Sequence, residues 1–182
     1  MFKLRELDKK DIAIINEWRN DPELISYLGA PYRFINVTVD ENWYNSYMAN
    51  RGNQIRCAIV NDNDTILGLV SLTNIDYINS SAEFHIMIGN KSAQNSGVGS
   101  FAINSMLSHA FLNMNLQRIE LSVLVSNKRA IHVYEKMGFV YEGTKRNCCY
   151  KEGKFTDMHI YSVLRSEWTE VCGGGYFYQL TA

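Results

Sequence analysis

Two glycines one residue apart, Gly97 and Gly99, stand in the segment SAQNSGVGSF at residues 92–101, where a helix is predicted to begin. The first N–H groups of a helix have no acceptor within the helix, and they lie at the positive end of its dipole. A glycine lets an anionic group approach these amides closely because no Cβ intervenes. The pattern predicts a turn for a nucleotide cofactor or an acyl carrier, with a purely structural tight turn as the third alternative.

The glycine spacing also fits a dinucleotide-binding fingerprint, since residues 97–102 read G-x-G-x-x-A. In that fold the turn follows its strand almost at once, whereas here residues 90–96 separate the glycines from the preceding strand. Only 80 residues follow Ala102, too few for the remaining strands of a doubly wound domain and a substrate site. A P-loop does not fit either, because no Lys followed by Ser or Thr comes after the glycines.

Hydrophobic periodicity predicts the elements that must hold this turn. A helix with Ile103, Leu107 and Phe111 on one stripe follows the glycines, and the last two strands form a hairpin about residues 151–154. The predicted order is β-α-α-β-β-β-α-β-α-β-β, a mixed α/β (α+β) architecture. The predicted strands are residues 2–7, 54–60, 65–74, 82–89, 118–125, 140–150 and 155–164.

Capping residues predict where the helices begin and end. The segment NDP at residues 20–22 breaks the first helix, and Thr38 with Glu41 forms a capping box for the second. Asn127 caps the last helix, and Gly138 ends it where left-handed backbone is wanted.

Composition places the chain among ordinary globular proteins. It has 182 residues, of which 46% are hydrophobic and 20% charged, enough for one domain with a full core. A net charge of -1, from 18 basic and 19 acidic residues, offers no footprint for nucleic acid or a membrane surface. No apolar run is long enough to span a bilayer, and the N-terminal segment has no apolar signal region, so a cytoplasmic protein is expected.

The cysteines predict free thiols, because they form no C-x-x-C pair and none has zinc-site spacing with a histidine. No metal site is therefore expected. We expect a single domain at residues 1–170 and a tail at residues 171–182. A homodimer is compatible with the sequence, since the hairpin and tail could pair across chains. The four cysteines are Cys57, Cys148, Cys149 and Cys172.

Two motifs together resemble the GNAT superfamily of N-acetyltransferases. Residues 94–99, QNSGVG, match Q/R-x-x-G-x-G/A, the acyl-CoA pyrophosphate loop of that family, and NKRAIHVYEKMGFVYEG at residues 127–143 resembles its second motif. The resemblance runs from Phe2 to about Trp168 and implies a central twisted mixed β-sheet flanked by about four helices. The cofactor would lie where two strands splay apart, with acetyl-CoA as the cosubstrate.

The resemblance also implies which residues hold the cofactor. The glycine turn would bind the diphosphate, and the backbone at the end of the strand AEFHIMI would pair with the pantetheine arm as an added strand does. Asn127 would contact the pantetheine, cap its helix, or do both. The implied cofactor-binding residues are Ile86, Met87, Ile88, Gln94, Asn95, Ser96, Gly97, Val98, Gly99, Ser100, Asn127 and Tyr134.

The implied chemistry is transfer of an acetyl group from a thioester to a primary amine. A lysine-like amine has a pKa of about 10.4 and attacks only when neutral, so a base or a water chain is needed. Glu83 matches a strand carboxylate that acts on the amine in many family members, and His85 projects from the same face two residues on. Tyr134 matches the tyrosine near the sulfur and is expected to protonate or orient the leaving thiolate. A free N–H near Ile88 could stabilise the oxyanion.

The acceptor is expected beneath the first two helices and their loop, where aromatic and cationic side chains gather. At least one of Trp18 and Trp43 is expected in the core, and an arginine could hold an acceptor phosphate. The predicted acceptor-site residues are Trp18, Arg19, Asn20, Tyr32, Arg33, Trp43, Tyr47 and His85.

Three acceptor classes follow from the resemblance: an amino-sugar nucleotide, a protein N-terminus and a polyamine. The arginines and aromatics favour the amino-sugar nucleotide slightly. A polyamine would want a cluster of carboxylates, whereas Ser71 and Asn74 stand where the spermidine-acetylating branch carries acidic residues. A non-catalytic CoA-binding domain of the same fold is the remaining alternative.

Overall fold

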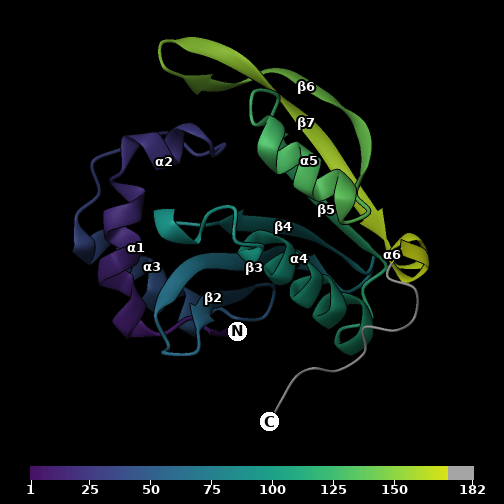
Figure 1. Ribbon diagram of the computed structural model, residues 1–182, viewed down its shortest axis with the longest axis horizontal. Helices are drawn as coiled ribbons and strands as arrows, with labels where there is room; N and C mark the ends of the chain where they lie inside the picture. The colour runs from purple at the N-terminus through teal and green to yellow at the C-terminus, as the bar shows by residue number, and fades with distance from the viewer. Residues whose placement is uncertain (172–182) are drawn as a thin grey trace.

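The computed structural model describes residues 1–171, so residues 172–182 of the predicted tail, with Cys172, lie outside the described part of the chain. Seven strands form one sheet in the order β1-β2-β3-β4-β5-β7-β6 (Figure 1). Neighbouring strands are antiparallel, except that β4 and β5 are parallel, so the predicted mixed architecture is confirmed. The strands are β1 (Phe2–Glu6), β2 (Ile55–Asn61), β3 (Ile66–Asp76), β4 (Ser81–Met87), β5 (Arg118–Leu124), β6 (Val140–Lys151) and β7 (Lys154–Leu164).

Within residues 1–171 the four expected helices are present as α1, α3, α4 and α5, and two short ones are additional. The additional α2 begins at Pro22, where the NDP segment had predicted only a break, because Asp21 accepts N–H bonds from Glu23 and Leu24 and caps a new helix. The helices are α1 (Ile12–Arg19), α2 (Pro22–Ser26), α3 (Val37–Ala49), α4 (Val98–Ser108), α5 (Lys128–Lys136) and α6 (Arg165–Val171).

The other capping predictions have mixed outcomes. The Asn127 side chain accepts the N–H of Ala130, and Gly138 has φ of +90°, so both ends of α5 are confirmed. The capping box of Thr38 and Glu41 is wrong, because α3 begins at Val37 under a cap from Asn36.

The buried apolar residues form two clusters. The larger one lies between the sheet and the helices α4 and α5, with Phe111, Ile103 and Leu72 fully buried in it. The smaller core joins α1 and α3 to the sheet and contains Trp18 and Tyr47. A Cβ on Gly89 would lie 1.9 Å from the Trp18 ring, so glycine alone allows this close approach.

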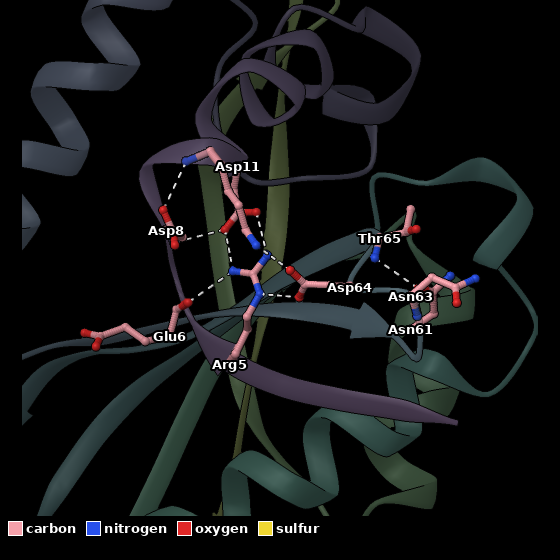
Figure 2. A network of polar contacts seen from close by, with 9 residues as sticks. Arg5, Glu6, Asp8, Asp11, Asn61, Asn63, Asp64 and Thr65 are labelled. Atoms are coloured by element: carbon pink, nitrogen blue, oxygen red, sulfur yellow. Dashed lines mark hydrogen bonds and ion pairs between the residues drawn. The ribbon is translucent and has the colours of Figure 1, made fainter.

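A network of ion pairs fastens the first strand to the turn after β2 (Figure 2). Arg5 donates two bonds of 2.8 Å to the buried Asp11 and one of 2.6 Å to Asp64, which also pairs with Lys10. Asp11 accepts the N–H of Asp8 as well, at 2.9 Å. These contacts tie β1 to the segment before α1 and to the turn after β2, so their expected role is to stabilise the fold.

The sheet opens at its centre, as the family resemblance implied. The parallel strands β4 and β5 are paired at only three positions, the last being Glu83 opposite Glu120. Beyond that point β4 stays with β3 as far as Met87, while β5 stays with β7 as far as Leu124. The facing edges of β4 and β5 therefore diverge and leave main-chain groups free to pair with a ligand.

No helix within residues 1–171 is both long and apolar enough to cross a membrane.

Candidate active site

A cleft of about 1230 Å³ occupies the splay between β4 and β5. Its walls include Ile86 and Met87 of β4, Ile88 just after that strand, and the end of β5, and α2 and α5 also contribute. Glu83, His85, Gly99, Asn127 and Tyr134 all line it, although they are widely separated in the sequence. The fold thus brings both predicted catalytic residues and part of the glycine turn into one cavity.

The glycine turn leads directly into α4. Gly97 has φ of +87° and is the N-terminal flanking residue of α4, with no side chain capping the first turn. The side chain of Val98 is buried, so this residue can offer only its main-chain N–H to a ligand. No atom lies within 4 Å of where a Cβ on Gly99 would stand, so space is open above the first amides of the helix. This arrangement fits a diphosphate.

Polar side chains around the turn extend the same end of the cleft. Gln94 donates a bond of 3.4 Å to the carbonyl of Ile88 and accepts one of 3.2 Å from Arg129. It therefore connects the residue just after β4 with α5. Sequence reasoning missed Arg129, although its place two residues after Asn127 in the second motif was a signal.

Tyr134 lies deep in the cleft. Its ring packs against Phe84 and Phe139 with centroid separations of 6.5 and 5.7 Å. Burial raises its pKa to about 12, so the hydroxyl keeps its proton at neutral pH. No other residue within 1–171 forms a hydrogen bond with this hydroxyl, which leaves its O–H available to a ligand.

Asn127 has a structural role that the structure makes explicit. Its side-chain oxygen caps α5, and its amide donates a bond of 3.0 Å to the carbonyl of Tyr27 just after α2. Asn127 thereby ties one wall of the cleft to another. A pantetheine contact remains a prediction.

The amine side of the cleft is a polar face of the sheet. Glu83 and His85 project from β4, with 3.6 Å between a carboxylate oxygen and Nε2, and Nε2 also lies 2.8 Å from the Thr73 hydroxyl. Desolvation lowers the pKa of His85, and nearby Arg56 lowers it further against the raising effect of Glu83. His85 is therefore neutral at pH 7, and the charge of Glu83 has no cationic partner within the described residues.

Further carboxylates continue this face onto β5 and β6. Glu120 is the register partner of Glu83, and Arg118 pairs with both Glu120 and Glu142, at 3.1 and 2.5 Å. The Arg118 guanidinium and a bond from Ser162 lower the pKa of Glu142 to about 2. Sequence reasoning missed this group, although Arg118 and Glu120 are alternate polar residues on an otherwise apolar strand, which is the signal of one polar face.

The predicted acceptor wall forms differently from expectation. Of its eight residues, only His85 lines the cleft. Trp18 and Tyr47 belong to the smaller core, because α1 and α3 must bury an apolar face against the sheet. The burial of Trp18 confirms the expectation that at least one of Trp18 and Trp43 is a core residue. Arg19 is neutralised by the buried Asp40.

The other predicted acceptor residues lie on or near the loop between α2 and α3. Asn20 fixes this loop by bonding to both the N–H and the carbonyl of Ile35. Tyr32 and Arg33 are exposed on the loop, and Trp43 is half-buried beside Arg56, with 4.9 Å between guanidinium and ring. Contact between these residues and a substrate remains a prediction.

Residues 2–140 match the family model described as an Acetyltransferase (GNAT) domain, and the chain belongs to this family. It is 32% identical over 166 residues to a spermidine N(1)-acetyltransferase of Vibrio cholerae, covering 91% of this chain and 94% of the relative. The Escherichia coli K12 spermidine N(1)-acetyltransferase is 29% identical, with coverage of 78% and 74%. A crystal structure of the V. cholerae spermidine N-acetyltransferase with CoA and spermine superposes with a TM-score of 0.86 at 30% identity, covering 92% and 97% of the two chains.

The protein is thus an N-acetyltransferase that uses acetyl-CoA as its acetyl donor. The expected fold, enzyme class and cosubstrate are confirmed. The slight preference for an amino-sugar nucleotide finds no support, since these relatives are named for spermidine. A homodimer remains a prediction.

Proposed function

We propose that this enzyme transfers the acetyl group of acetyl-CoA to a primary amine of a polyamine. The observation that carries the proposal is the row of carboxylates in the lining at the splay. Arg118 pairs with Glu120 and Glu142, whereas Glu83 has no ion pair with a Lys or Arg among residues 1–171. A carboxylate without a cationic partner attracts an acceptor that carries several ammonium groups. The naming of the relatives for spermidine supports the same acceptor class.

The absence of carboxylates at Ser71 and Asn74 had argued against a polyamine. In the proposed site the negative charge comes instead from β4, β5 and β6, which the tertiary structure brings together. Glu83 and Glu120 are opposite one another at the last pair before the strands part. An ammonium group there would lie between two carboxylates and beside the opening of the cleft.

Each group then has a defined task. Acetyl-CoA supplies the acetyl group as a thioester. Glu83, directly or through water, takes a proton from the ammonium so that a neutral amine can attack. Tyr134, protonated at neutral pH, donates its proton to the departing thiolate. The first amides of α4 and the free edge of β4 would hold the diphosphate and the pantetheine arm.

A thiol-release assay with acetyl-CoA tests the proposal against three acceptors: spermidine, a ribosomal N-terminal peptide and a UDP-amino sugar. We expect kcat/KM to be highest for spermidine. A higher kcat/KM for either of the other two would overturn the polyamine assignment.

Two variants test the proposed roles of the carboxylates. Glu83→Gln should remove the acidic limb of the pH profile of kcat/KM, and an unchanged profile would exclude Glu83 as the base. Glu120→Gln should raise the KM for spermidine several-fold while leaving kcat within about twofold, because it weakens acceptor binding. An unchanged KM would place the acceptor elsewhere.

A further inference from the structure

A side pocket of about 480 Å³ adjoins the cleft and shares Arg56, Ser71 and His85 with it. The pocket is polar, and neither Asp nor Glu is among its lining residues. Its chemistry is therefore opposite to that of the carboxylate-rich side around Glu120. The remaining lining residues are Asn53, Gln54, Thr73 and Asn74.

Arg56 dominates this pocket. It lies on β2 opposite Ser71, which in turn is opposite His85 on β4, so the three side chains form a row across one face of the sheet. The guanidinium is 4.9 Å from the Trp43 ring centre and 5.9 Å from that of Tyr47. Its Nε donates a bond of 3.0 Å to Gln54. The aromatic rings and this bond hold the guanidinium in place.

Arg56 lacks the anionic partner that other partly buried arginines have. Arg5 pairs with Asp11, Arg19 with Asp40, and Arg118 with Glu142. Within residues 1–171 no carboxylate lies within ion-pair distance of Arg56.

The surroundings of Arg56 disfavour its charge. Burial is the main cause that lowers its pKa; Tyr47 opposes this in part, and the nearby cation Arg19 adds a smaller lowering effect. An arginine nevertheless remains charged in a protein, so a partly desolvated positive charge persists without an anionic partner among residues 1–171. Such a group is satisfied when a ligand brings an oxyanion, which the planar guanidinium binds through two parallel bonds.

We propose that the side pocket is a subsite for an oxyanion, a carboxylate or a phosphate, carried by a second class of amine acceptor. Arg56 would bind the anionic end while the amine lies at Glu83. From strand spacing and rise, the Cα atoms of these two residues are about 12 Å apart, which suits an amine and an anion joined by a short carbon chain. The inference rests on the acetyltransferase activity and is independent of the choice of a polyamine.

Three acceptors of similar length, used in the thiol-release assay, isolate the charge at the far end. 5-Aminopentanoate carries a carboxylate, 4-aminobutyl phosphate carries a phosphate, and pentylamine carries neither. In the wild type we expect kcat/KM for at least one anionic acceptor to exceed that for pentylamine roughly tenfold, the usual scale for a charged hydrogen bond. The arm with the larger gain identifies the oxyanion.

Substitutions assign the preference to Arg56. Arg56→Met keeps an unbranched chain against Trp43 and should abolish the preference, while Arg56→Lys, which keeps the charge without the fork, should retain part of it. Arg51→Gln is the matched control, because Arg51 is exposed, pairs with Glu6 and lies outside the pocket lining. It should retain the full preference.

The proposal is overturned if the wild type prefers neither anionic acceptor over pentylamine, or if Arg56→Met keeps the preference. Pentanoate, which carries one carboxylate, gives a test that needs no variant when used as an inhibitor competitive with the amine in the wild type, and failure to compete counts against the pocket. Spermidine in the same assay separates the two proposals. If spermidine is a good acceptor and no anionic acceptor is preferred over pentylamine, only the side-pocket proposal is overturned. If an anionic acceptor is preferred and spermidine is a poor acceptor, only the polyamine assignment is overturned.

Discussion

The ion network at the N-terminal edge and the polar face of the cleft contain the same kinds of side chain in different states of pairing. Around Arg5, both carboxylates are matched by cations or N–H groups, as Figure 2 shows. In the cleft, Glu83 faces a neutral imidazole, the Tyr134 hydroxyl has no bond to the described residues, and Arg56 has no carboxylate there. The charges around Arg5 are thus matched among the described residues, whereas those of Glu83 and Arg56 are not, and we expect the substrates to match them.

The contrast shows where the free protein contains polar groups whose lack of a partner lowers its stability. A partly buried polar group without a partner destabilises the free protein, and a ligand that supplies the partner recovers that free energy on binding. Paired groups should therefore affect stability when altered, and unpaired ones should affect catalysis.

The largest effect is expected for Tyr134→Phe, which should lower kcat about 100-fold because the thiolate loses its proton donor. Thermal stability should hardly change, since the hydroxyl bonds to no described residue. Tyr161→Phe is the matched control, because Tyr161 is not among the residues that line the cleft. Burial and its bond to Glu135 also raise the pKa of Tyr161 to about 12. Equal kcat losses in the two variants would contradict the assignment.

Asp11→Ala should act in the opposite way, lowering the free energy of unfolding by about 2 kcal/mol. Arg5 would lose two bonds and keep the one to Asp64, and the N–H of Asp8 would lose its acceptor. Urea titrations measure the loss of stability. The thiol-release assay, run without urea, should give an unchanged kcat/KM for the folded enzyme. Asp62→Ala is the control. Asp62 is exposed and pairs with the exposed N-terminal amine, so its loss should change stability by less than about 0.5 kcal/mol. A loss of activity without a loss of stability in Asp11→Ala would break the comparison.

Gly99→Ala should raise the Kd for CoA about tenfold, because its methyl group would enter the space where the diphosphate is expected. The free energy of unfolding should stay the same or rise slightly, since that space is open in the free protein and alanine favours a helix more than glycine does. Calorimetric titration with CoA measures the change, with Gly52→Ala, also in open space, as the control. Unaltered CoA affinity would move the diphosphate away from this turn.

The smallest effect concerns Glu142, whose ordinary pKa of 4.5 falls to about 2 beside Arg118 in the folded protein. Because the folded pKa is the lower one, the stabilisation is fully present above pH 4.5 and is lost as the pH falls toward 2. Glu142→Gln should flatten the pH dependence of unfolding in this window by less than about 1 kcal/mol, given the partial exposure of the pair. Urea titrations at pH 5 and pH 3 measure it, and an identical slope in wild type and variant would argue against this ion pair.

The sequence by itself predicted the order of strands and main helices along the chain, the caps of α5, the glycine turn before α4 and the two catalytic candidates. These features depend on local rules: alternation in strands, capping chemistry, and the freedom of glycine at residues 97 and 99. The family motifs then extended this local pattern to an acetyltransferase, and the comparisons confirmed it.

Only the tertiary structure decided which polar residues share the cleft. Glu83 and Glu120 meet because β4 and β5 pair in parallel for three positions and then diverge, a register that no local pattern encodes. The same packing removed Trp18 and Tyr47 from the expected acceptor wall and left Arg56 facing a side pocket. Side-chain type and spacing predict what a residue is able to do, but long-range pairing decides whether its charge is already matched within the protein.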